Sequence, residues 1–342
     1  MHGAIRTYLF EQPDDFASVK IVVIGANGFG KLHLASLARM DVEIEIFSRN
    51  QSSIDELSEQ YDIAKSYTDI NEALASDAEV ADIILPHNMH RDIAIKAMRC
   101  GKHVLVEKPI ATELSDAEEM IAESVKNRVK LMVAEQYYFD STARWITDAL
   151  RGKKIGDLHA LIIRDQRLYS GHGWRTKASV MGGGALVDGG IHYIDALLNF
   201  GGPYSGVKSY VSKGASSIEE EDTTAALFRF RNGATGIFFY SWSYANPARV
   251  PSFELIGTKG SVVEDLETKP RVDFKYMTGV RHAFGRPVLN GQTVDIAIED
   301  AFDSEIRGFL DSVKNNSDVP FPPELALRDL RGVKDIQHAA SA

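Results

Sequence analysis

The sequence is poor in cysteine, because Cys100 is the one cysteine among 342 residues. A single thiol cannot form an internal disulfide, which excludes a disulfide-stapled fold and favours a reducing, cytoplasmic compartment. Cys100 follows a predicted helix, where we expect a small buried side chain. Long apolar runs are missing too, since no segment approaches the roughly 18 uninterrupted apolar residues of a membrane span. We therefore expect no membrane span and, without an apolar core before Lys20, no signal peptide.

The chain also has fewer positively charged residues than negatively charged ones. Lys and Arg number 38 against 48 Asp and Glu, so the formal net charge is −10, and no block of basic residues offsets it locally. Binding to the phosphate backbone of nucleic acid is therefore not expected. The proportions of hydrophobic residues (44%) and charged residues (25%) are those of a globular protein, which disfavours disordered, collagen-like and coiled-coil classes.

From Lys20 to Tyr138, short apolar runs alternate with amphipathic segments. The runs KIVVIGA, VEIEIF, ADIILP, HVLVEKP and KLMVAEQYY predict buried strands, and the segments KLHLASLARM and HRDIAIKAMRCG repeat apolar residues at helical spacing. This alternation predicts right-handed crossovers and a doubly wound parallel sheet. We therefore predict an α/β Rossmann domain over residues 1–138, in which 1–19 form an N-terminal extension without an assigned role.

After Tyr138 the strand-like segments follow one another without intervening helices. Asn232-Gly233 lies between two alternating runs, which is typical of a hairpin, and the alternation in RVDFKYM (271–277) predicts a further strand. The segments GGGALVDGGIHYIDALLNFGG, EDAFDSEIRGFLDSVKN and PPELALRDLRGVKDIQHAAS are predicted as helical. We therefore predict an α+β domain with a mostly antiparallel open sheet over residues 139–342.

A glycine-rich turn, GANGFG (25–30), joins the first predicted strand to the first predicted helix. This context is what a dinucleotide fingerprint requires, because glycines permit the tight turn and the close helix packing while the helix N-terminus faces a pyrophosphate. Asn27 replaces the middle glycine of G-x-G-x-x-G, but it tolerates positive φ and a glycine follows it. We predict a dinucleotide site, with an ordinary glycine turn as the alternative, formed by Gly25, Asn27, Gly28, Phe29 and Gly30.

The second predicted strand ends in Phe47-Ser48-Arg49, where an NAD site usually has an acid for the ribose 2′-hydroxyl. Ser48 can donate a hydrogen bond to a 2′-phosphate, and Arg49 can pair with that phosphate or stack on adenine. These residues predict that NADP(H) is favoured over NAD(H). A solvated arginine on a loop is the alternative interpretation of Arg49.

Two motifs resemble those of the Gfo/Idh/MocA family: Glu107-Lys108-Pro109, which closes HVLVEKP, and GGGALVDGGIHYID. The resemblance spans nearly the whole chain. It implies a two-domain oxidoreductase in a family that includes glucose–fructose oxidoreductase, inositol dehydrogenases and sugar 3-ketoreductases. It also implies a second sheet that often serves as the oligomer interface, so a homodimer or homotetramer is expected.

The resemblance further implies which residues form the site. The family's lysine of the E-K-P motif corresponds to Lys108, and its aspartate and histidine correspond to Asp188 and His192. The family's P-x-x-x-H segment corresponds to Pro86 and His90, which are expected near the cofactor.

The E-K-P motif also contributes Glu107, which we expect near the cofactor. Two positions depart from the family pattern or have no clear role. His87 stands where many members have Asn, and Tyr138 stands where many have an arginine, so a substrate contact made by that arginine cannot be transferred.

Asp188 and His192 are four residues apart on a predicted helix, which places them one turn apart on one face. We predict that His192 exchanges a proton with the reacting oxygen and that Lys108 stabilises the charge on that oxygen, with an exchange of these two roles as the alternative. Asp188 is predicted to orient His192 or to bind a neighbouring hydroxyl. Asp195 lies on the same face, but one helix rarely supplies a whole metal site, so no metal is expected and Asp195 is predicted to be structural.

The loop LYSGHGWRTKASVMGGG carries Tyr169, Trp174 and Arg175, which we predict to contact a sugar ring, with plain packing as the alternative for Trp174. The predicted function is hydride transfer between a nicotinamide and a secondary alcohol or ketone of a sugar, cyclitol or sugar derivative, so the partner is a polyol or keto-sugar. The alternatives are a dehydrogenase of a non-sugar hydroxy compound and a non-catalytic dinucleotide sensor. Retention of Lys108, Asp188 and His192 counts against the sensor.

Overall fold

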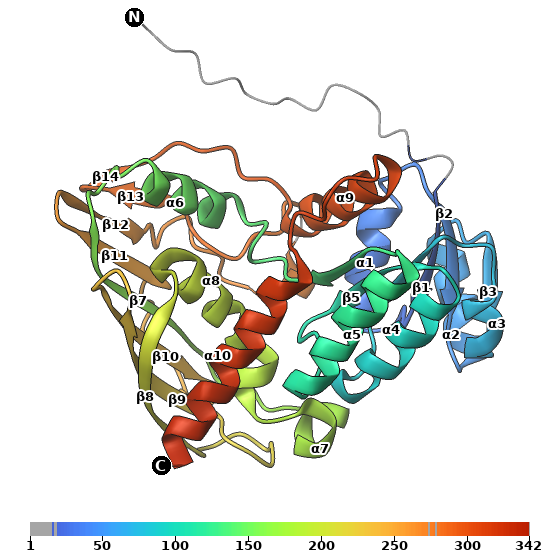
Figure 1. Ribbon diagram of the computed structural model, residues 1–342, viewed down its shortest axis with the longest axis horizontal. Helices are drawn as coiled ribbons and strands as arrows, with labels where there is room; N and C mark the ends of the chain where they lie inside the picture. The colour runs from blue at the N-terminus through green and yellow to red at the C-terminus, as the bar shows by residue number, and fades with distance from the viewer. Residues whose placement is uncertain (1–15, 17–18, 273, 278, 342) are drawn as a thin grey trace, which may run out of the picture.

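The computed structural model describes residues 16, 19–272, 274–277 and 279–341. Figure 1 shows a smaller sheet with helices on both sides, a larger sheet beside it, and the long C-terminal helix α10 (Pro323–Ser341) running between them. The N-terminal extension, to which the sequence assigns no role, lies outside the described residues apart from Phe16 and Val19.

The smaller sheet is parallel throughout and has the strand order β3-β2-β1-β4-β5-β6. The order reverses between β1 and β4, and in such sheets ligands bind beyond the carboxyl ends of the strands. The predicted doubly wound Rossmann fold is therefore confirmed. Its strands and helices are β1 (Lys20–Ile24), β2 (Glu43–Phe47), β3 (Lys65–Tyr67), β4 (Val80–Ile83), β5 (His103–Glu107), β6 (Leu131–Ala134), α1 (Gly30–Leu37), α2 (Gln51–Gln60), α3 (Ile70–Leu74), α4 (His90–Arg99) and α5 (Leu114–Asn127).

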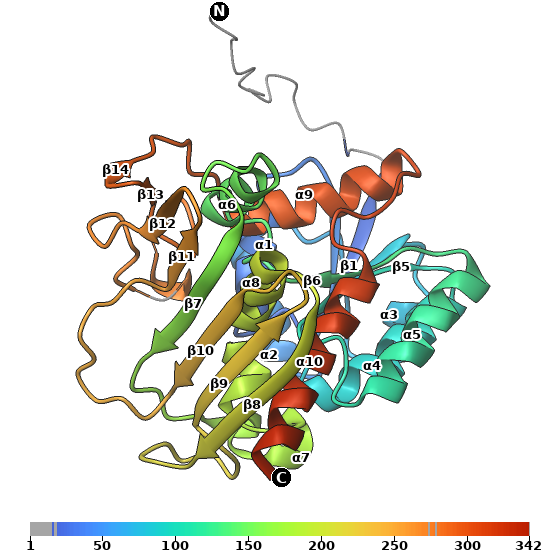
Figure 2. The ribbon, with the colours of Figure 1, turned by 60° about the vertical axis from the view of Figure 1, so that its left-hand side comes forward.

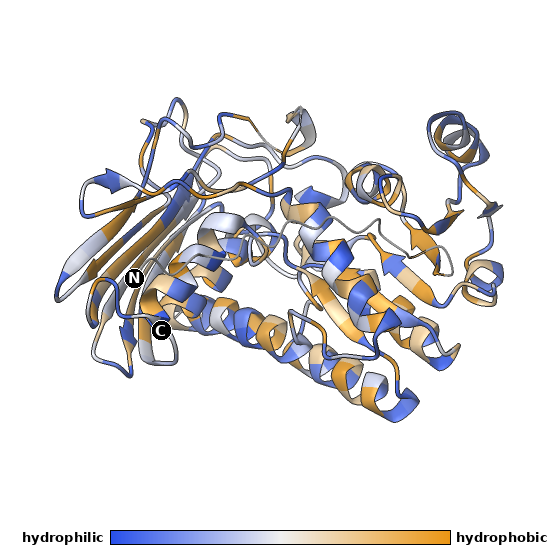
Figure 3. Cartoon of the chain, turned by 90° about the horizontal axis from the view of Figure 1, so that it is seen from above, coloured by the Kyte–Doolittle hydropathy of each residue, from blue (hydrophilic) through white to orange (hydrophobic). Residues whose placement is uncertain are grey.

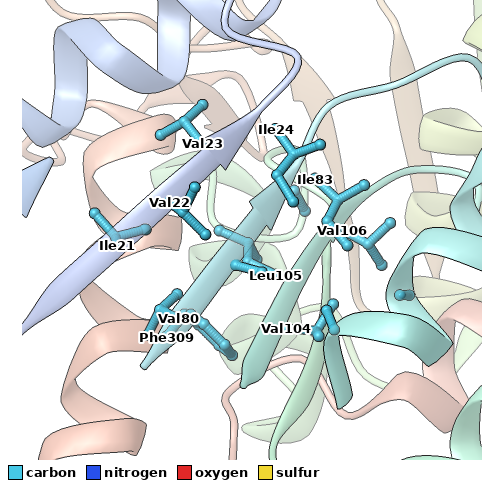
Figure 4. Close-up of a cluster of buried hydrophobic side chains, with 14 of the residues drawn as sticks. Ile21, Val22, Val23, Ile24, Val80, Ile83, Val104, Leu105, Val106 and Phe309 are labelled. Carbon is cyan, nitrogen blue, oxygen red and sulfur yellow. The ribbon is translucent and has the colours of Figure 1, made fainter. Parts of the chain in front are cut away.

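The core of this domain explains why its strands are apolar on both faces. Helices cover both sides of the sheet, as the orange strands between helices show in Figure 3, so alternate residues cannot be polar as they are in a half-exposed strand. Burying each such side chain contributes about 1.5–3 kcal/mol. Figure 4 shows the centre of this cluster, which contains Ile21, Val22, Val23, Ile24, Val80, Ile83, Val104, Leu105, Val106 and, from α9 (Ala301–Lys314), Phe309.

The larger sheet has the strand order β14-β13-β12-β11-β7-β10-β9-β8 and is antiparallel except between β7 and β10. The predicted mostly antiparallel sheet is confirmed, and so is its hairpin, in which Gly233 adopts a φ of +91° between β9 and β10. The strands are β7 (Leu158–Gln166), β8 (Tyr204–Ser212), β9 (Thr223–Phe230), β10 (Thr235–Ser241), β11 (Phe253–Gly257), β12 (Gly260–Glu264), β13 (Pro287–Leu289) and β14 (Gln292–Thr293).

The strand predicted at 271–277 is wrong. The described part of this segment is irregular, with a 3₁₀ turn at Phe274–Tyr276. Phe274 packs edge-on against Tyr137 and Phe302, at ring-centroid distances of 5.7 and 5.3 Å. Phe274 therefore anchors a loop to an aromatic cluster, whereas Val272 and Tyr276 of the same segment are exposed, so the alternation of apolar residues here does not mark a strand.

The remaining helices join the two cores. The C-terminal residues Ile306 and Leu330 belong to the Rossmann core, whereas Phe302 and Ile336 belong to the core beneath the larger sheet. The last two helices are therefore shared by both units, and a single division after residue 138 does not describe their packing. The helices outside the Rossmann domain are α6 (Ser141–Arg151), α7 (Ala178–Met181), α8 (Ile191–Gly201), α9 (Ala301–Lys314) and α10.

Two expectations about the surface are tested by the structure. Within the described residues, no helix combines the length and the apolarity that crossing a membrane requires. Cys100, which we expected to be buried, is exposed because it is the C-cap of α4, where the chain turns toward β5.

Candidate active site

A cavity of about 560 Å³ is lined by residues from both units of the fold. Lys108 enters it from the end of β5, and His192 enters it from α8. The sequence-predicted residues that line it are Gly28, Phe29, Lys108, Tyr169, Arg175, Asp188 and His192. The structure thus brings the glycine turn, the E-K-P lysine and the glycine-led helix to one place, at the carboxyl ends of the Rossmann strands.

The glycine turn has the geometry that the dinucleotide fingerprint predicts. Gly25 has a φ of +102°, and a Cβ there would lie 2.0 Å from the carbonyl oxygen of Ile84. A Cβ at Gly30 would lie 2.2 Å from the oxygen of Gly25, so both positions exclude a side chain. A Cβ at Gly28 would meet nothing within 4 Å, and Gly28 lines the cavity. Bare backbone therefore faces the cavity, and these residues fit a dinucleotide pyrophosphate.

The residues after β2 lie where the coenzyme's ribose is expected. Ser48 is 8% exposed, and its hydroxyl accepts a hydrogen bond from the backbone N–H of Asn50 at 3.2 Å. Arg49 is exposed, and Asn50 caps α2 by accepting from the N–H of Ser52 at 3.0 Å. A serine hydroxyl, a guanidinium and a helix N-terminus are thus grouped together, and each can bind a phosphate.

Asp188 is the centre of a buried cluster of hydrogen-bond donors. Lys108 Nζ donates to the backbone oxygen of Asp188 at 2.5 Å and lies 3.4 Å from Oδ1. Arg175 Nε donates to Oδ2 at 2.8 Å, and His87 Nε2 lies 3.4 Å from Oδ1. Burial would raise the pKa of Asp188, but Lys108 and Arg175 hold this pKa well below its usual value. Asp188 is therefore a carboxylate that fixes the Lys108 ammonium in the cavity.

The predicted pairing of Asp188 with His192 is corrected by the structure. The His192 ring is bonded through Nδ1 to Glu135 Oε1 at 2.5 Å, and Tyr137 stacks on it at 4.3 Å with an interplanar angle of 10°. Asp188 lies in a π-helical turn (Leu186–Gly190) before α8, where the cations on neighbouring segments draw its carboxylate to themselves. Glu135 therefore orients the imidazole instead.

Glu135 is the functional residue that sequence reasoning missed. It directly follows β6, so it stands at the carboxyl edge of the parallel sheet, where ligand-contacting residues gather. The register pairs Glu107 with Ala134, which makes Lys108 and Glu135 neighbours at the ends of adjacent strands. An acid inside KLMVAEQYY, the last strand predicted for the Rossmann domain, was the signal that could have identified it.

Two residues predicted near the cofactor are turned into the protein. His90 is fully buried, and its ring nitrogens lie 2.8 Å from the oxygen of Pro109 and 2.9 Å from that of Leu85. Glu107 is bonded to His33 Nε2 at 3.1 Å and accepts from its neighbour's backbone N–H at 3.1 Å. Neither is among the described residues that line the cavity, because both satisfy their polar groups within the Rossmann domain.

Pro86 precedes the 3₁₀ turn His87–Met89, which leads from the end of β4 into α4. It therefore positions His87 in the Asp188 cluster, and it is likewise not among the described residues that line the cavity. Asn27 is exposed on the glycine turn.

The predicted substrate loop divides into residues that line the cavity and one that supports them. Tyr169 and Arg175 line the cavity, and Tyr169 packs against Trp242 at 4.7 Å. Trp174 packs edge-on against His87 at 4.8 Å, and the Arg175 guanidinium lies 4.3 Å from its ring centroid. The packing alternative for Trp174 is therefore the one that the structure supports.

Asp195 has the structural role that the sequence predicts. It accepts hydrogen bonds from Arg328 at 2.9 Å and from Asn199 at 2.8 Å. Tyr138 packs against Phe321 and lines a different cleft, of about 1080 Å³, so this position does not reach the Lys108 cavity. In the part of the chain that the structure describes, no group of three or more His, Cys, Asp or Glu residues is arranged to hold a metal ion.

The fold and the site together define a class of protein. A doubly wound parallel sheet with a bare glycine turn provides a dinucleotide site, and a lysine and a histidine from separate units face the same cavity. These features are those of a two-domain oxidoreductase that uses a dinucleotide coenzyme.

Comparison with known families identifies the family of oxidoreductases to which the chain belongs. The family model described as "Oxidoreductase family, NAD-binding Rossmann fold" matches residues 19–135, and the model described as "GFO/IDH/MocA C-terminal domain" matches residues 143–263. The chain belongs to the Gfo/Idh/MocA family of oxidoreductases, so the resemblance seen in its two motifs is confirmed.

Relatives with assigned activities include inositol dehydrogenases. The chain is 27% identical to myo-inositol 2-dehydrogenase of Thermotoga maritima over 260 residues, which cover 72% of this chain and 75% of the relative. It is 28% identical to an NADP⁺-dependent scyllo-inositol 2-dehydrogenase of Bacillus subtilis over 278 residues, which cover 76% and 80%. The crystal structure of an oxidoreductase from Thermotoga maritima shares the fold, with a TM-score of 0.82, 21% identity and coverage of 94% and 96%.

Proposed function

We propose that this protein transfers a hydride between a nicotinamide coenzyme and a secondary alcohol or ketone of a sugar, cyclitol or sugar derivative. The observation that carries the proposal is that Lys108 and His192 line one cavity together with Gly28 of the glycine turn. The names of the two inositol dehydrogenases support a polyhydroxylated ring as the substrate. The scarcity of cysteine supports a reducing compartment such as the cytoplasm.

The residues of the cavity divide the chemistry between them. When bound along Gly25–Gly30, the coenzyme supplies or accepts the hydride. With Nδ1 bonded to Glu135, Nε2 is the nitrogen of His192 that exchanges a proton with the reacting oxygen. The Lys108 ammonium donates a hydrogen bond to the same oxygen and stabilises negative charge on it. Asp188 holds that ammonium in place, and Arg175 is available to bind a neighbouring hydroxyl.

The coenzyme is proposed to be NADP(H) rather than NAD(H). Ser48 and Arg49 follow β2 without an acid, and Asn50 begins α2 beside them. A carboxylate at this place would repel a 2′-phosphate, whereas a hydroxyl and a guanidinium bind one. The bidentate geometry of arginine makes Arg49 the residue that we expect to distinguish the two coenzymes.

A turnover panel tests the function and the coenzyme together. We expect oxidation of myo-inositol, scyllo-inositol or an aldose, or reduction of the matching ketone, with kcat/KM at least about tenfold higher for the NADP couple than for the NAD couple. Arg49→Ser should reduce that ratio without changing kcat. Binding of NADPH without turnover of any substrate would favour the sensor alternative, and an equal or higher kcat/KM with NAD would overturn the role of Arg49.

The outer face of the larger sheet is proposed as the interface of a homodimer or homotetramer. Figure 2 shows β7, β10, β9 and β8 at the front, with α8 and α10 behind them. Three apolar side chains on these and the next strand are exposed: Leu227 by 54%, Ile237 by 41% and Ile256 by 42%. The register places Leu227 opposite Ile237, so the exposed apolar surface extends across β9 and β10.

A single charge on this face should weaken the assembly. Leu227→Glu is expected to shift the protein toward the monomer, because a carboxylate would be buried at the interface without a partner. Light scattering after size-exclusion chromatography measures the change, with the exposed Lys96→Glu on α4 as the control. A wild-type protein that is monomeric at micromolar concentration would refute the proposed interface.

A further inference from the structure

Glu135 and His192 form a buried pair that meets the cavity on one side only. Glu135 is 2% exposed and His192 is 7% exposed, and 2.5 Å separates Oε1 from Nδ1. The imidazole lines the cavity, whereas Glu135 is not among the described residues that do so. The same Glu135 oxygen accepts from the N–H of Tyr137 at 3.3 Å, and the Tyr137 ring covers the imidazole face. Any effect of Glu135 on a substrate therefore passes through the histidine ring.

The charges around the pair decide where its proton resides. Burial raises the pKa of Glu135 to about 8. Burial lowers the pKa of His192 well below its usual value, and the Lys108 ammonium lowers it further. At neutral pH the shared proton therefore lies on Glu135, which donates it to Nδ1, and the neutral ring carries its own proton on Nε2. An imidazolium beside Lys108 is disfavoured, so His192 cannot hold a spare proton by itself.

We propose that Glu135 is the proton source and sink behind His192, a positioning residue that fixes the ring tautomer and exchanges a proton with Nδ1 whenever Nε2 exchanges one with the substrate oxygen. The inference rests on the proposed function, because it assigns the proton path of that reaction. Glu135 takes over one of the two roles predicted for Asp188, the orientation of His192, because Lys108 and Arg175 hold Asp188.

The proton movements balance in both directions. In ketone reduction the carbonyl carbon gains a hydride and its oxygen takes the Nε2 proton, while Nδ1 takes the Glu135 proton. The ring ends neutral in its other tautomer, and Glu135 ends as a carboxylate. In alcohol oxidation the hydroxyl proton passes to Nε2, the Nδ1 proton returns to Glu135, and a hydride leaves the carbon. No additional charge develops on the imidazole in either direction.

Several charged groups face this pair from other elements and set the field in which it titrates. Lys108 opposes protonation of His192, while the negative charges of Glu107 and Asp188 favour it. Lys108 also favours the charged form of Glu135, and Glu107 opposes it. The groups coupled electrostatically to the pair are Glu107 and Lys108 at the end of β5, Asp188 before α8, Arg167 after β7, Asp195 on α8, Glu305 on α9 and Asp329 on α10.

The pH dependence of turnover tests the relay. In the wild type, kcat for reduction should fall as pH rises through about 8, because Glu135 must be protonated, and kcat for oxidation should rise through the same pH. Glu135→Gln cannot exchange a proton, so kcat should fall by about 10²-fold in both directions, KM should change by less than about threefold, and the inflection should vanish. Glu135→Asp should restore part of the rate together with an inflection.

The matched control is Glu45→Gln, which makes the same change at a fully buried carboxyl on β2, outside the cavity lining and outside the charged groups named above. We expect it to keep the wild-type inflection. A Glu135→Gln variant with wild-type kcat, or with the inflection intact, would overturn the relay. If no polyol or ketone is turned over by the wild type, the proposed function fails, and the location of the proton is decided by a separate measurement.

That measurement is ¹⁵N NMR of the histidine rings in the wild type without substrate, with His192→Gln used for assignment. The relay requires a neutral His192 ring that is protonated on Nε2 below about pH 8 and gains Nδ1–H character as Glu135 ionises. A ring protonated on both nitrogens at pH 7, or a tautomer unaffected by pH between 6 and about 9.5, would overturn the proposal whatever the activity. The NMR result also decides the matter if Glu135→Gln fails to fold.

Discussion

Replacing Lys108 with methionine is expected to lower kcat by about 10³-fold. Methionine keeps most of the length and apolar volume of the lysine stem but removes the donor that stabilises charge on the reacting oxygen. Lys108 is 8% exposed, and its ammonium is held at 2.5 Å from the backbone oxygen of Asp188. Because this charge is largely buried, its interaction with a developing alkoxide is stronger than it would be in solvent.

The measurement is steady-state turnover combined with coenzyme titration by fluorescence. Coenzyme affinity should change by less than about tenfold in Lys108→Met, because the glycine turn remains intact, so the loss should appear in kcat. Lys96→Met, at an exposed position on α4, is the matched control and should behave as wild type. A Lys108→Met variant that keeps more than a tenth of wild-type kcat would contradict the assigned role.

Replacing His33 with leucine is expected to cost about 3–5 kcal/mol of unfolding free energy. His33 is fully buried in α1, with Nδ1 at 2.9 Å from Asp82 Oδ2 and Nε2 at 3.1 Å from Glu107 Oε1. Burial alone would lower the pKa of His33, but the two carboxylates raise it well above 6.5. Leucine fills the space and leaves two buried carboxyl groups without their cation.

The loss should depend on pH with a definite sign. The folded pKa of His33 is raised above the unfolded value, so its stabilisation is fully present below about pH 6.5 and is lost as pH rises through the folded pKa. The difference between wild type and His33→Leu in urea unfolding should therefore be largest near pH 6 and smaller at alkaline pH. His159→Leu, at an exposed position, serves as the control. A difference that grows with pH would show that His33 is neutral in the fold.

The elements of the Rossmann domain could be predicted because their causes are local. Strands buried on both faces must be apolar throughout, and helices must repeat apolar residues at their own period, so the residues of KIVVIGA and KLHLASLARM are enough to predict β1 and α1. The glycine turn between them is equally local, since Gly25 and Gly30 are required by backbone contacts within this unit. The strand predicted at 271–277 was wrong because Phe274 packs from a loop into an aromatic cluster, while Val272 and Tyr276 are exposed.

The residues that form the site could be predicted from the sequence, but the contacts between them could not. The E-K-P and glycine-led motifs pointed to Lys108 and His192, and both line the cavity. Helical spacing paired Asp188 with His192, whereas Asp188 contacts Lys108, which is 80 residues away, and His192 contacts Glu135, which is 57 residues away. Glu107 and His90 were expected at the cofactor and are turned inward.

The sequence by itself therefore determined the α/β alternation, the dinucleotide turn and the residue types that carry the chemistry. Only the tertiary structure decided which carboxylate serves which cation. That choice follows from the register of β5 beside β6, which makes Lys108 and Glu135 neighbours, and from the position of α8, from which His192 reaches Glu135 and the cavity. In a buried site, polar groups bond to the partners that the fold places within reach, whether or not those partners are close in the sequence.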